Sequence, residues 1–248
     1  MKPIYLTEID STQTYITQLL PDQGPHVPIA AYTFNQKKGK GQGNKKWNCK
    51  ANAGIALTIA VPFPQNKETD WVLVNKHICS GIITYLREQI HPDFFLKWPN
   101  DLIINDRKFG GMIMNVVTKN DTAYLVLGLG LNLKQPSQYP EAIGMLEVLN
   151  LRKFDPLPFT KKLITFLKNH ITRPPLKKTA FIYNQYLWKL DEIVTFQFYN
   201  IRTKKSEDPL SKKFMGVDMH GRAFFEMGDM LIGSHSGGAS ILLPPRKK

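Results

Sequence analysis

Apolar positions along the chain predict strands and helices over its first three quarters. A continuous apolar run at residues 54–61 is typical of a buried strand, and residues 122–133 form a second long strand. Shorter strands are predicted at residues 4–9 and 27–34. Apolar residues at helical spacing predict helices that end near residue 20 and that cover residues 68–90, 159–170 and 177–190. Asp10, Ser11 and Thr12 supply N-cap chemistry for the first of these helices.

The pattern changes after residue 190. Short alternating strands are predicted at residues 193–199, 214–218, 222–226 and 241–243, with a turn at His220 and Gly221. Regular short strands separated by turn signals favour a small β-barrel. We therefore expect a domain boundary here, with one domain over residues 1–189 and another over residues 190–248.

A hairpin in the middle of the chain carries the first candidate chemistry. An apolar strand end at residues 94–96 leads into Lys-Trp-Pro-Asn-Asp at residues 97–101. Asn105 and Asp106 are turn formers, and a return strand begins at Lys108. A Gly110–Gly111 pair follows, where a ligand could approach bare backbone. An ordinary surface hairpin with solvated charges is the alternative, but the irregular run at 97–101 favours a functional site.

A second candidate lies at residues 35–47, where three glycines alternate with basic and amide residues. Such a segment cannot form a stable helix or strand. It can wrap an anion with backbone N–H groups and cationic side chains together. A disordered basic loop fits the same composition, so both interpretations stand at this point.

Composition and charge limit the class of protein. The 248 residues are 42% hydrophobic and carry a formal charge of +13, which favours anionic partners. The basic residues occur in scattered pairs, which is more typical of a solvated surface than of a nucleic-acid groove. The two cysteines, Cys49 and Cys79, form no metal-ligand pattern and no disulfide framework. No signal peptide and no apolar run of about 20 residues is present, so we expect a cytoplasmic protein without a membrane partner.

The hairpin closely resembles the central motif of biotin protein ligases, the enzymes that attach biotin to carboxylase carrier domains. In that family Lys-Trp-Pro-Asn-Asp is followed, after a short hairpin, by Lys-x-x-Gly-Ile/Met, and here these segments begin at Lys97 and Lys108. The loop at 35–47 is similar to the family's Gln-x-x-Gly-Arg-Gly-Arg/Gln, with Lys40 where the family usually has Arg. The resemblance spans almost the whole chain.

Two further segments extend the resemblance. Residues 8–13 are similar to the family's Glu-x-x-Asp-Ser-Thr-Asn, with Gln13 in place of the final Asn. Residues 128–132 are similar to its Gly-Ile-Gly-Ile-Asn; a dinucleotide-binding fingerprint is excluded because no third glycine opens a helix. The resemblance implies an α+β fold: a mixed β-sheet flanked by helices, as in class II synthetases, followed by a small SH3-like barrel. It also implies that the N-terminal DNA-binding domain of the ligase–repressors is missing.

The resemblance assigns roles by position. It implies a catalytic role, neutralising charge on the phosphates, for Lys108, Lys97 and Lys40. Biotin would be bound by Ser11, Thr12, Gln13, Gln36, Gly39, Lys40, Gly41, Lys108, Gly110 and Gly111. ATP would be bound by Gln42, Lys45, Trp47, Lys97, Asn100, Asp101 and Asn132. No direct protein cluster for a metal is expected, since Mg²⁺ would lie on the phosphates.

The implied reaction is the ATP-dependent formation of biotinyl-5′-AMP and the transfer of biotin to a lysine of a biotin carboxyl carrier protein or domain. We expect no specific DNA partner, and a homodimer is left open. Three alternatives remain: a lipoate or octanoate ligase of the same superfamily, a biotin-binding regulator without catalysis, and a nucleic-acid-binding protein suggested by charge alone. Pyrophosphate release with biotin and ATP would discriminate among them, and salt-dependent retention on DNA would favour the last.

Overall fold

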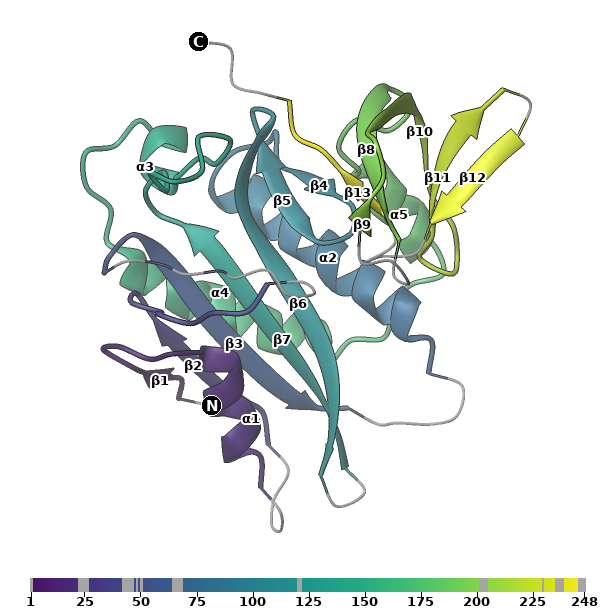
Figure 1. Cartoon of the computed structure of the whole chain (residues 1–248). Helices are drawn as coiled ribbons and strands as arrows, with labels where there is room; N and C mark the ends of the chain where they lie inside the picture. The colour runs from purple at the N-terminus through teal and green to yellow at the C-terminus, as the bar shows by residue number, and fades with distance from the viewer. Residues whose placement is uncertain are drawn as a thin grey trace. The chain divides into compact units, whose positions relative to one another are not determined.

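The computed structural model describes residues 2–21, 27–41, 47, 49, 51–63, 69–119, 122–200, 205–228, 230–234 and 239–244. The chain divides into two compact units (Figure 1). The first unit contains Met1–Thr69 and Phe109–Pro174, and the second contains Asp70–Lys108 and Pro175–Lys248. These units do not coincide with the expected domains 1–189 and 190–248, whose boundary stays a prediction.

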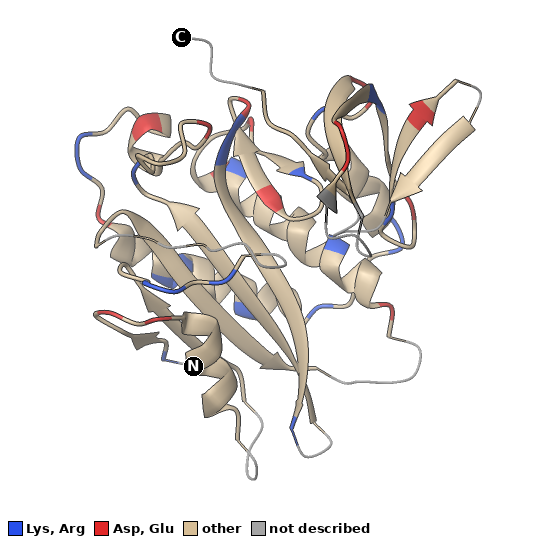
Figure 2. Ribbon diagram, viewed as in Figure 1, with Lys and Arg blue, Asp and Glu red and all other residues tan. Residues whose placement is uncertain are grey.

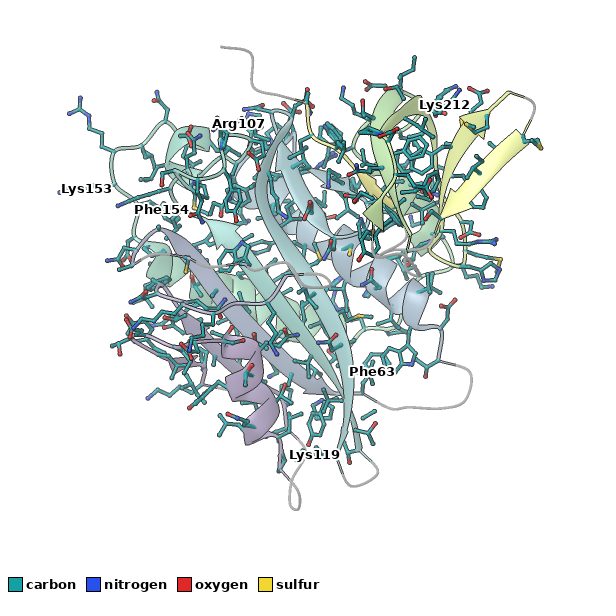
Figure 3. All side chains as sticks on the ribbon, viewed as in Figure 1. Phe63, Arg107, Lys119, Lys153, Phe154 and Lys212 are labelled. Carbon is teal, nitrogen blue, oxygen red and sulfur yellow. The ribbon has the colours of Figure 1, made fainter. Side chains whose placement is uncertain are left out.

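The first unit is built on a mixed sheet. Its strands, in spatial order, are β1 (Ile4–Tyr5), β2 (Ile29–Thr33), β3 (Gly54–Pro62), β7 (Thr122–Asn132) and β6 (Arg107–Lys119, in this unit from Phe109). β1 is parallel to β2, and the remaining pairs are antiparallel. Arg107 and Lys119 are labelled at the two ends of β6 in Figure 3. The mixed sheet expected from the resemblance is confirmed.

The centre of this sheet is apolar on both faces. β3 pairs with β7 over nine consecutive residues and is buried over all but its last position. Helices α1 (Thr12–Leu19) and α4 (Pro156–Ile171) pack on β3 from opposite faces (Figure 1). Because water reaches neither face, the sequence of β3 reads as a continuous apolar run rather than an alternating one. A short helix, α3 (Met145–Val148), was not predicted from the sequence.

The second unit begins with a long helix and a short hairpin. Helix α2 (Trp71–Gln89) is capped by Asp70, whose carboxylate accepts from the Leu73 N–H at 2.9 Å. β4 (Phe95–Lys97) and β5 (Asp101–Ile104) pair antiparallel, with Lys97 opposite Asp101. The expected turn at Asn105 and Asp106 is confirmed, since both take positive φ, at 52° and 55°.

The last part of the second unit is an antiparallel sheet. It contains β8 (Ile193–Asn200), β9 (Lys205–Ser206), β10 (Leu210–Val217), β11 (Ala223–Met227), β12 (Met230–Ser234) and β13 (Ala239–Ile241). The strand order is β12-β11-β10-β8-β13, with β9 paired to β8. Phenylalanines fill its core, and the rings of Phe196 and Phe225 stack at 3.9 Å. The expected second, small β-structure at the C-terminal end is therefore present.

Two predicted elements are shorter than expected. The helix predicted over residues 177–190 is only α5 (Thr179–Gln185), because the next backbone groups bond to β4 instead. Leu96 donates to the Tyr186 carbonyl at 2.7 Å, and Trp188 donates to the Leu96 carbonyl at 2.9 Å. The strand predicted over residues 4–9 ends at Tyr5, because the backbone bends at residues 7 and 8.

Charge is spread over many elements of both units. Figure 2 shows the described Lys and Arg residues on helices, strands and loops rather than on one element of either unit. This distribution agrees with the scattered pairs in the sequence and gives no support to a nucleic-acid groove. Among the helices of the described residues, none has the length and apolar character required to span a bilayer.

Candidate active site

The hairpin of the second unit brings two lysines to one carboxylate. Lys97 and Asp101 are opposite each other where β4 and β5 meet their three-residue connection. Lys108 follows after the turn, at the start of β6. The Lys97 ammonium lies 2.9 Å from Asp101 Oδ2, and the Lys108 ammonium lies 2.5 Å from Asp101 Oδ1. We call these three residues the lysine–aspartate cluster.

The cluster combines buried and accessible charge. The side chains of Lys97 and Asp101 are 7% and 16% exposed, whereas that of Lys108 is 35% exposed. Burial alone would raise the pKa of Asp101, but the adjacent charges and hydrogen bonds of Lys97 and Lys108 outweigh it, so the pKa is lowered. Asp101 is therefore ionised at neutral pH. Lys108 keeps enough exposure to meet an anionic ligand.

The start of α1 in the first unit holds a second polar cluster. Gln36 Oε1 accepts from the Thr12 N–H at 2.8 Å and from the Thr12 hydroxyl at 3.2 Å. The Thr12 hydroxyl also lies 2.9 Å from the Thr58 hydroxyl of β3. All three side chains are buried. We call Thr12, Gln36 and Thr58 the amide–hydroxyl cluster.

Thr58 belongs to the amide–hydroxyl cluster, although the sequence did not point to it. It is fully buried at the centre of β3, where its neighbours in the strand are apolar. A buried hydroxyl needs a hydrogen-bond partner, so an isolated threonine in an apolar strand is a recognisable signal for a polar site. The predicted residue Ser11 lies beside the cluster as the N-cap of α1, accepting from the Thr14 N–H at 3.3 Å.

Gln13 extends the same region with a donor that is not used. Among the described residues, no hydrogen-bond partner is found for its buried Nε2 atom. A Cβ placed on Gly128 would lie 3.8 Å from this nitrogen and 3.8 Å from the Thr58 hydroxyl. The Gln13 amide therefore lies close to the amide–hydroxyl cluster. It offers an N–H to a polar ligand bound there.

Backbone hydrogen bonds connect the described residues of the glycine-rich segment. Gln36 and Cys49 exchange two backbone hydrogen bonds of 3.1 Å, and Trp47 donates to the Gly39 carbonyl at 2.8 Å. A Cβ on Gly39 would lie 1.9 Å from the Trp47 carbonyl oxygen, so no larger residue fits this position. Lys40 and Gly41 follow within the described part of the segment, and Lys40 is exposed. The predicted ATP-binding residues Gln42 and Lys45 lie outside the described residues.

Two glycines have packing roles: Gly110, which was predicted as a site residue, and Gly130 of β7, which was not. A Cβ on Gly110 would lie 2.3 Å from the Gly130 carbonyl, across the β6–β7 pair. A Cβ on Gly130 would lie 2.6 Å from the Trp47 ring, so the indole rests directly on β7. Gly111 pairs with Gly130 in the same register. The ligand roles predicted for Trp47, Gly110 and Gly111 stay predictions, and the structure adds a packing reason for Trp47 and Gly110.

The remaining predicted site residues are divided between the two units. Asn132 ends β7 in the first unit, where it is buried and donates from Nδ2 to the Ile143 carbonyl at 3.3 Å. Asn100 lies in the β4–β5 connection of the second unit, next to Asp101, and is half-buried. Across the described part of the chain, no group of three His, Cys, Asp or Glu residues is placed to hold a metal ion.

Comparison with known proteins decides the family. A model of the biotin/lipoate A/B protein ligase family matches residues 5–132, just over half of the chain. The chain belongs to this family. The match covers the amide–hydroxyl cluster, the lysine–aspartate cluster and Asn132.

Relatives of known name are similar over the same part of the chain. The bifunctional ligase/repressor BirA of Escherichia coli strain K12 is 29% identical over 132 residues, which are 52% of this chain and 39% of that protein. The human biotin–protein ligase is 25% identical over 138 residues, which are 53% of this chain and 19% of that protein. The matched segment therefore spans less than half the length of either relative.

Solved structures share the fold of this family member over nearly its whole length. A biotin protein ligase from Aquifex aeolicus in complex with biotin and ATP matches 98% of this chain and 100% of its own, with a TM-score of 0.75 and 20% identity. Biotin acetyl coenzyme A carboxylase synthetase from Helicobacter pylori with bound biotinylated ATP matches 94% of this chain and 100% of its own, with a TM-score of 0.55 and 19% identity. The fold class predicted from the resemblance is confirmed.

Proposed function

We propose that the chain is a biotin protein ligase. It activates biotin with ATP to biotinyl-5′-AMP and transfers the biotinyl group to a specific lysine of a biotin carboxyl carrier protein or domain. Membership of the family supports this activity, as do solved structures of similar fold whose ligands are biotin with ATP or biotinylated ATP. The single observation that carries it is the lysine–aspartate cluster, in which two ammonium groups meet at the family's central motif.

The first step must bring anions together. A carboxylate oxygen of biotin attacks the α-phosphorus of ATP, the bond to the β-phosphate oxygen breaks, and pyrophosphate leaves. Cations that neutralise both reacting groups lower the barrier to this attack. Lys108 is the residue we assign to bridge the carboxylate and the α-phosphate, because its ammonium is paired yet partly exposed. Lys97 and Lys40 assist as further positive charges.

The second step needs no covalent enzyme intermediate. The neutral amine of the carrier lysine attacks the carbonyl carbon of the mixed anhydride, AMP leaves, and the amine proton is released to solvent. Asn100 and Asp101 position the nucleotide or the incoming amine. Two ammonium groups already engage the Asp101 carboxylate, so we do not assign it as a Mg²⁺ ligand. Mg²⁺ would be bound to the ATP phosphates as part of the substrate.

The biotin ring is assigned to the first unit. Its ureido group presents both donors and acceptors, and the hydroxyls of Ser11 and Thr12 with the amides of Gln13 and Gln36 supply matching groups. Gly39, Gly41, Gly110 and Gly111 complete this proposed surface. Gln42, Lys45, Trp47 and Asn132 belong to the proposed nucleotide site. The assignment of catalysis to residues 1–189, with an SH3-like domain at 190–248 and a cytoplasmic location, is part of the same proposal.

Pyrophosphate release tests the proposal directly. The protein is incubated with MgATP and biotin, with lipoate and octanoate as separate controls, and pyrophosphate is measured over time. We expect pyrophosphate release with MgATP and biotin, and none with MgATP and lipoate or octanoate. Release only with lipoate or octanoate would identify a lipoate-type ligase, and binding of biotin without release would identify a regulator. Transfer is then followed as biotin incorporation into a carrier domain, with the acceptor lysine of the carrier replaced by Arg as the control.

A further inference from the structure

The loop between β10 and β11 in the second unit is a self-bonded turn, which we call turn 217–222. The Asp218 carboxylate accepts from the backbone N–H groups of His220 at 2.9 Å and Arg222 at 2.8 Å. The same carboxylate is paired with the Arg222 guanidinium at 2.7 Å. Gly221 has a φ of +79°, a conformation that other residues rarely adopt. The carbonyl oxygens of the turn therefore point in fixed directions.

Two side chains from distant parts of the sequence donate to these carbonyls. Lys76 of α2 donates from Nζ to the Asp218 carbonyl at 2.5 Å. Trp98, which directly follows Lys97, donates from Nε1 to the Gly221 carbonyl at 3.1 Å. Turn 217–222 is thus bonded both to α2 and to the hairpin that carries the lysine–aspartate cluster.

A third side chain holds the first residue of the turn. Asn184 of α5 donates from Nδ2 to the Val217 carbonyl at 3.1 Å and accepts from the Val217 N–H at 3.0 Å. A side-chain amide that pairs with both the N–H and the carbonyl of one residue fixes the backbone at that residue on both sides of its Cα. The turn is therefore bonded from three elements: α2, the β4–β5 connection and α5.

The donor side chains of Lys76 and Trp98 are buried, so losing their acceptors is costly. Lys76 is 2% exposed and Trp98 is 1% exposed. Burial lowers the pKa of Lys76, while the charges of Asp218 and Asp70 act to raise it. Its ammonium also lies 5.4 Å from the centre of the Tyr183 ring. An ammonium group in such surroundings needs its acceptor, and the turn carbonyl supplies it.

We propose that turn 217–222 positions the lysine–aspartate cluster through Trp98, and that Lys76 holds the turn in place. Trp98 and Lys76 are positioning residues that act on the reacting groups through Lys97 and Asp101. The proposal rests on the proposed ligase function for its catalytic consequence. By this proposal the C-terminal sheet contributes to adenylate formation indirectly: its turn positions the cluster, and none of its own residues contacts the reacting groups.

The first test removes a single donor. Trp98→Phe keeps an aromatic ring in the buried position and removes the N–H that bonds Gly221, together with part of the indole ring. We expect kcat for biotin-dependent pyrophosphate release to fall about tenfold, the factor expected from the loss of one hydrogen bond. The KM for biotin should stay unchanged, because the ring of biotin is assigned to residues of the first unit.

Thr84→Val is the matched control. Thr84 lies on the same helix as Lys76, and its hydroxyl donates to the Ser80 carbonyl at 3.0 Å and lies 3.1 Å from the Tyr186 hydroxyl, with neither partner in the turn. This variant loses two side-chain hydrogen bonds of the second unit, so it should lower the melting temperature and leave kcat at the wild-type value. If Trp98→Phe and Thr84→Val have the same kcat, the turn does not position the cluster.

A second measurement is independent of catalysis. Amide hydrogen exchange of residues 97–108 should be faster in Trp98→Phe and in Lys76→Met than in wild type, and unchanged in Thr84→Val. The double variant Lys76→Met/Trp98→Phe should lose no more kcat than the more severe single variant, because both act through one turn. Unchanged exchange, or multiplied losses in the double variant, would overturn the proposal. A wild type without pyrophosphate release would refute the ligase function, and exchange would still decide whether the turn holds the hairpin.

Discussion

Replacing Asp101 with Asn is predicted to destabilise the protein more than any exposed charge substitution in the second unit. Asn has nearly the same shape as Asp, so the packing is kept, while the negative charge is lost and one of the two accepting oxygens becomes an NH2 donor. Lys97, with a side chain that is 7% exposed, would then lose the carboxylate charge that lies 2.9 Å from its ammonium. Lys108 would lose the same partner but could turn to solvent.

The expected loss is about 3 kcal/mol of unfolding free energy at pH 7, the lower end of the range for removing one partner of a buried ion pair. Most of this comes from the pair of Lys97 with Asp101, because both side chains are largely buried. The pair with Lys108 adds no more than about 1 kcal/mol, since Lys108 is 35% exposed and water screens the interaction.

The pH dependence gives the prediction a second signature. The pKa of Asp101 is lowered from 3.8 in the folded protein, so folding favours its charged form. The contribution to stability is therefore complete above the unfolded pKa of 3.8 and is lost as the pH falls through the folded pKa. At that point wild-type Asp101 is neutral, like Asn, and the two proteins should approach the same stability.

Urea unfolding followed by tryptophan fluorescence from pH 8 to pH 3 measures both effects. Asp191→Asn is the control, because its carboxylate is 64% exposed and lies 3.8 Å from the Lys213 ammonium. It should cost no more than about 0.5 kcal/mol at any pH. Equal losses for the two variants at pH 7, or a loss at Asp101 that persists unchanged at pH 3, would refute the reasoning.

Three further predictions concern the proposed reaction. Lys108→Ala should nearly abolish pyrophosphate release while changing the melting temperature little, because its side chain is partly exposed; wild-type release would remove it from the mechanism. Lys40→Arg should slow dissociation of biotinyl-5′-AMP and Lys40→Ala should speed it, each by a change of about 1–2 kcal/mol in the activation free energy of dissociation, as followed in a chase with unlabelled substrates. Equal rates in all three proteins would exclude residue 40 as an anchor. Thr58→Val should raise the KM for biotin about tenfold with kcat unchanged, because Thr12 loses its hydroxyl partner; an unchanged KM would place biotin elsewhere.

The central strands and the hairpin turn could be predicted because local chemistry determines them. The apolar run at 54–61 can only be buried, and Asn105 and Asp106 are residues that accept positive φ. The end of α5 could not be predicted, since it depends on bonds to Leu96, which lies far away in the sequence. β12 was missed because Met230 and Leu231 are both exposed, so the strand shows no alternation.

The candidate site also combines residues that a local motif predicts with residues that depend on distant contacts. Residues that stand together in a motif, such as Lys97 and Asp101, were found through the resemblance of that motif and meet as neighbours in the hairpin. Thr58 was missed, and Gly221 was predicted only as a turn residue, because each meets its partner, Thr12 or Trp98, only in the folded chain. A polar residue in an apolar strand gave a signal that could have been used for Thr58. No comparable signal marks a backbone carbonyl that accepts from an indole.

The backbone pairing of Gln36 with Cys49 places a natural thiol where its reactivity reports whether that pairing is intact. Both cysteines are buried, and burial raises the pKa of Cys79 to about 12 and also raises that of Cys49. Neither thiol should react with an alkylating reagent while its surroundings stay closed. The described contacts of Cys49 include the two backbone bonds to Gln36 and a hydrogen bond that its Sγ accepts from the Gln36 N–H at 3.4 Å. The rate at which an alkylating reagent traps Cys49 therefore reports how often residues 36 and 49 separate, and its slowing by a bound ligand would measure how far that ligand stabilises this pairing, without any engineered label.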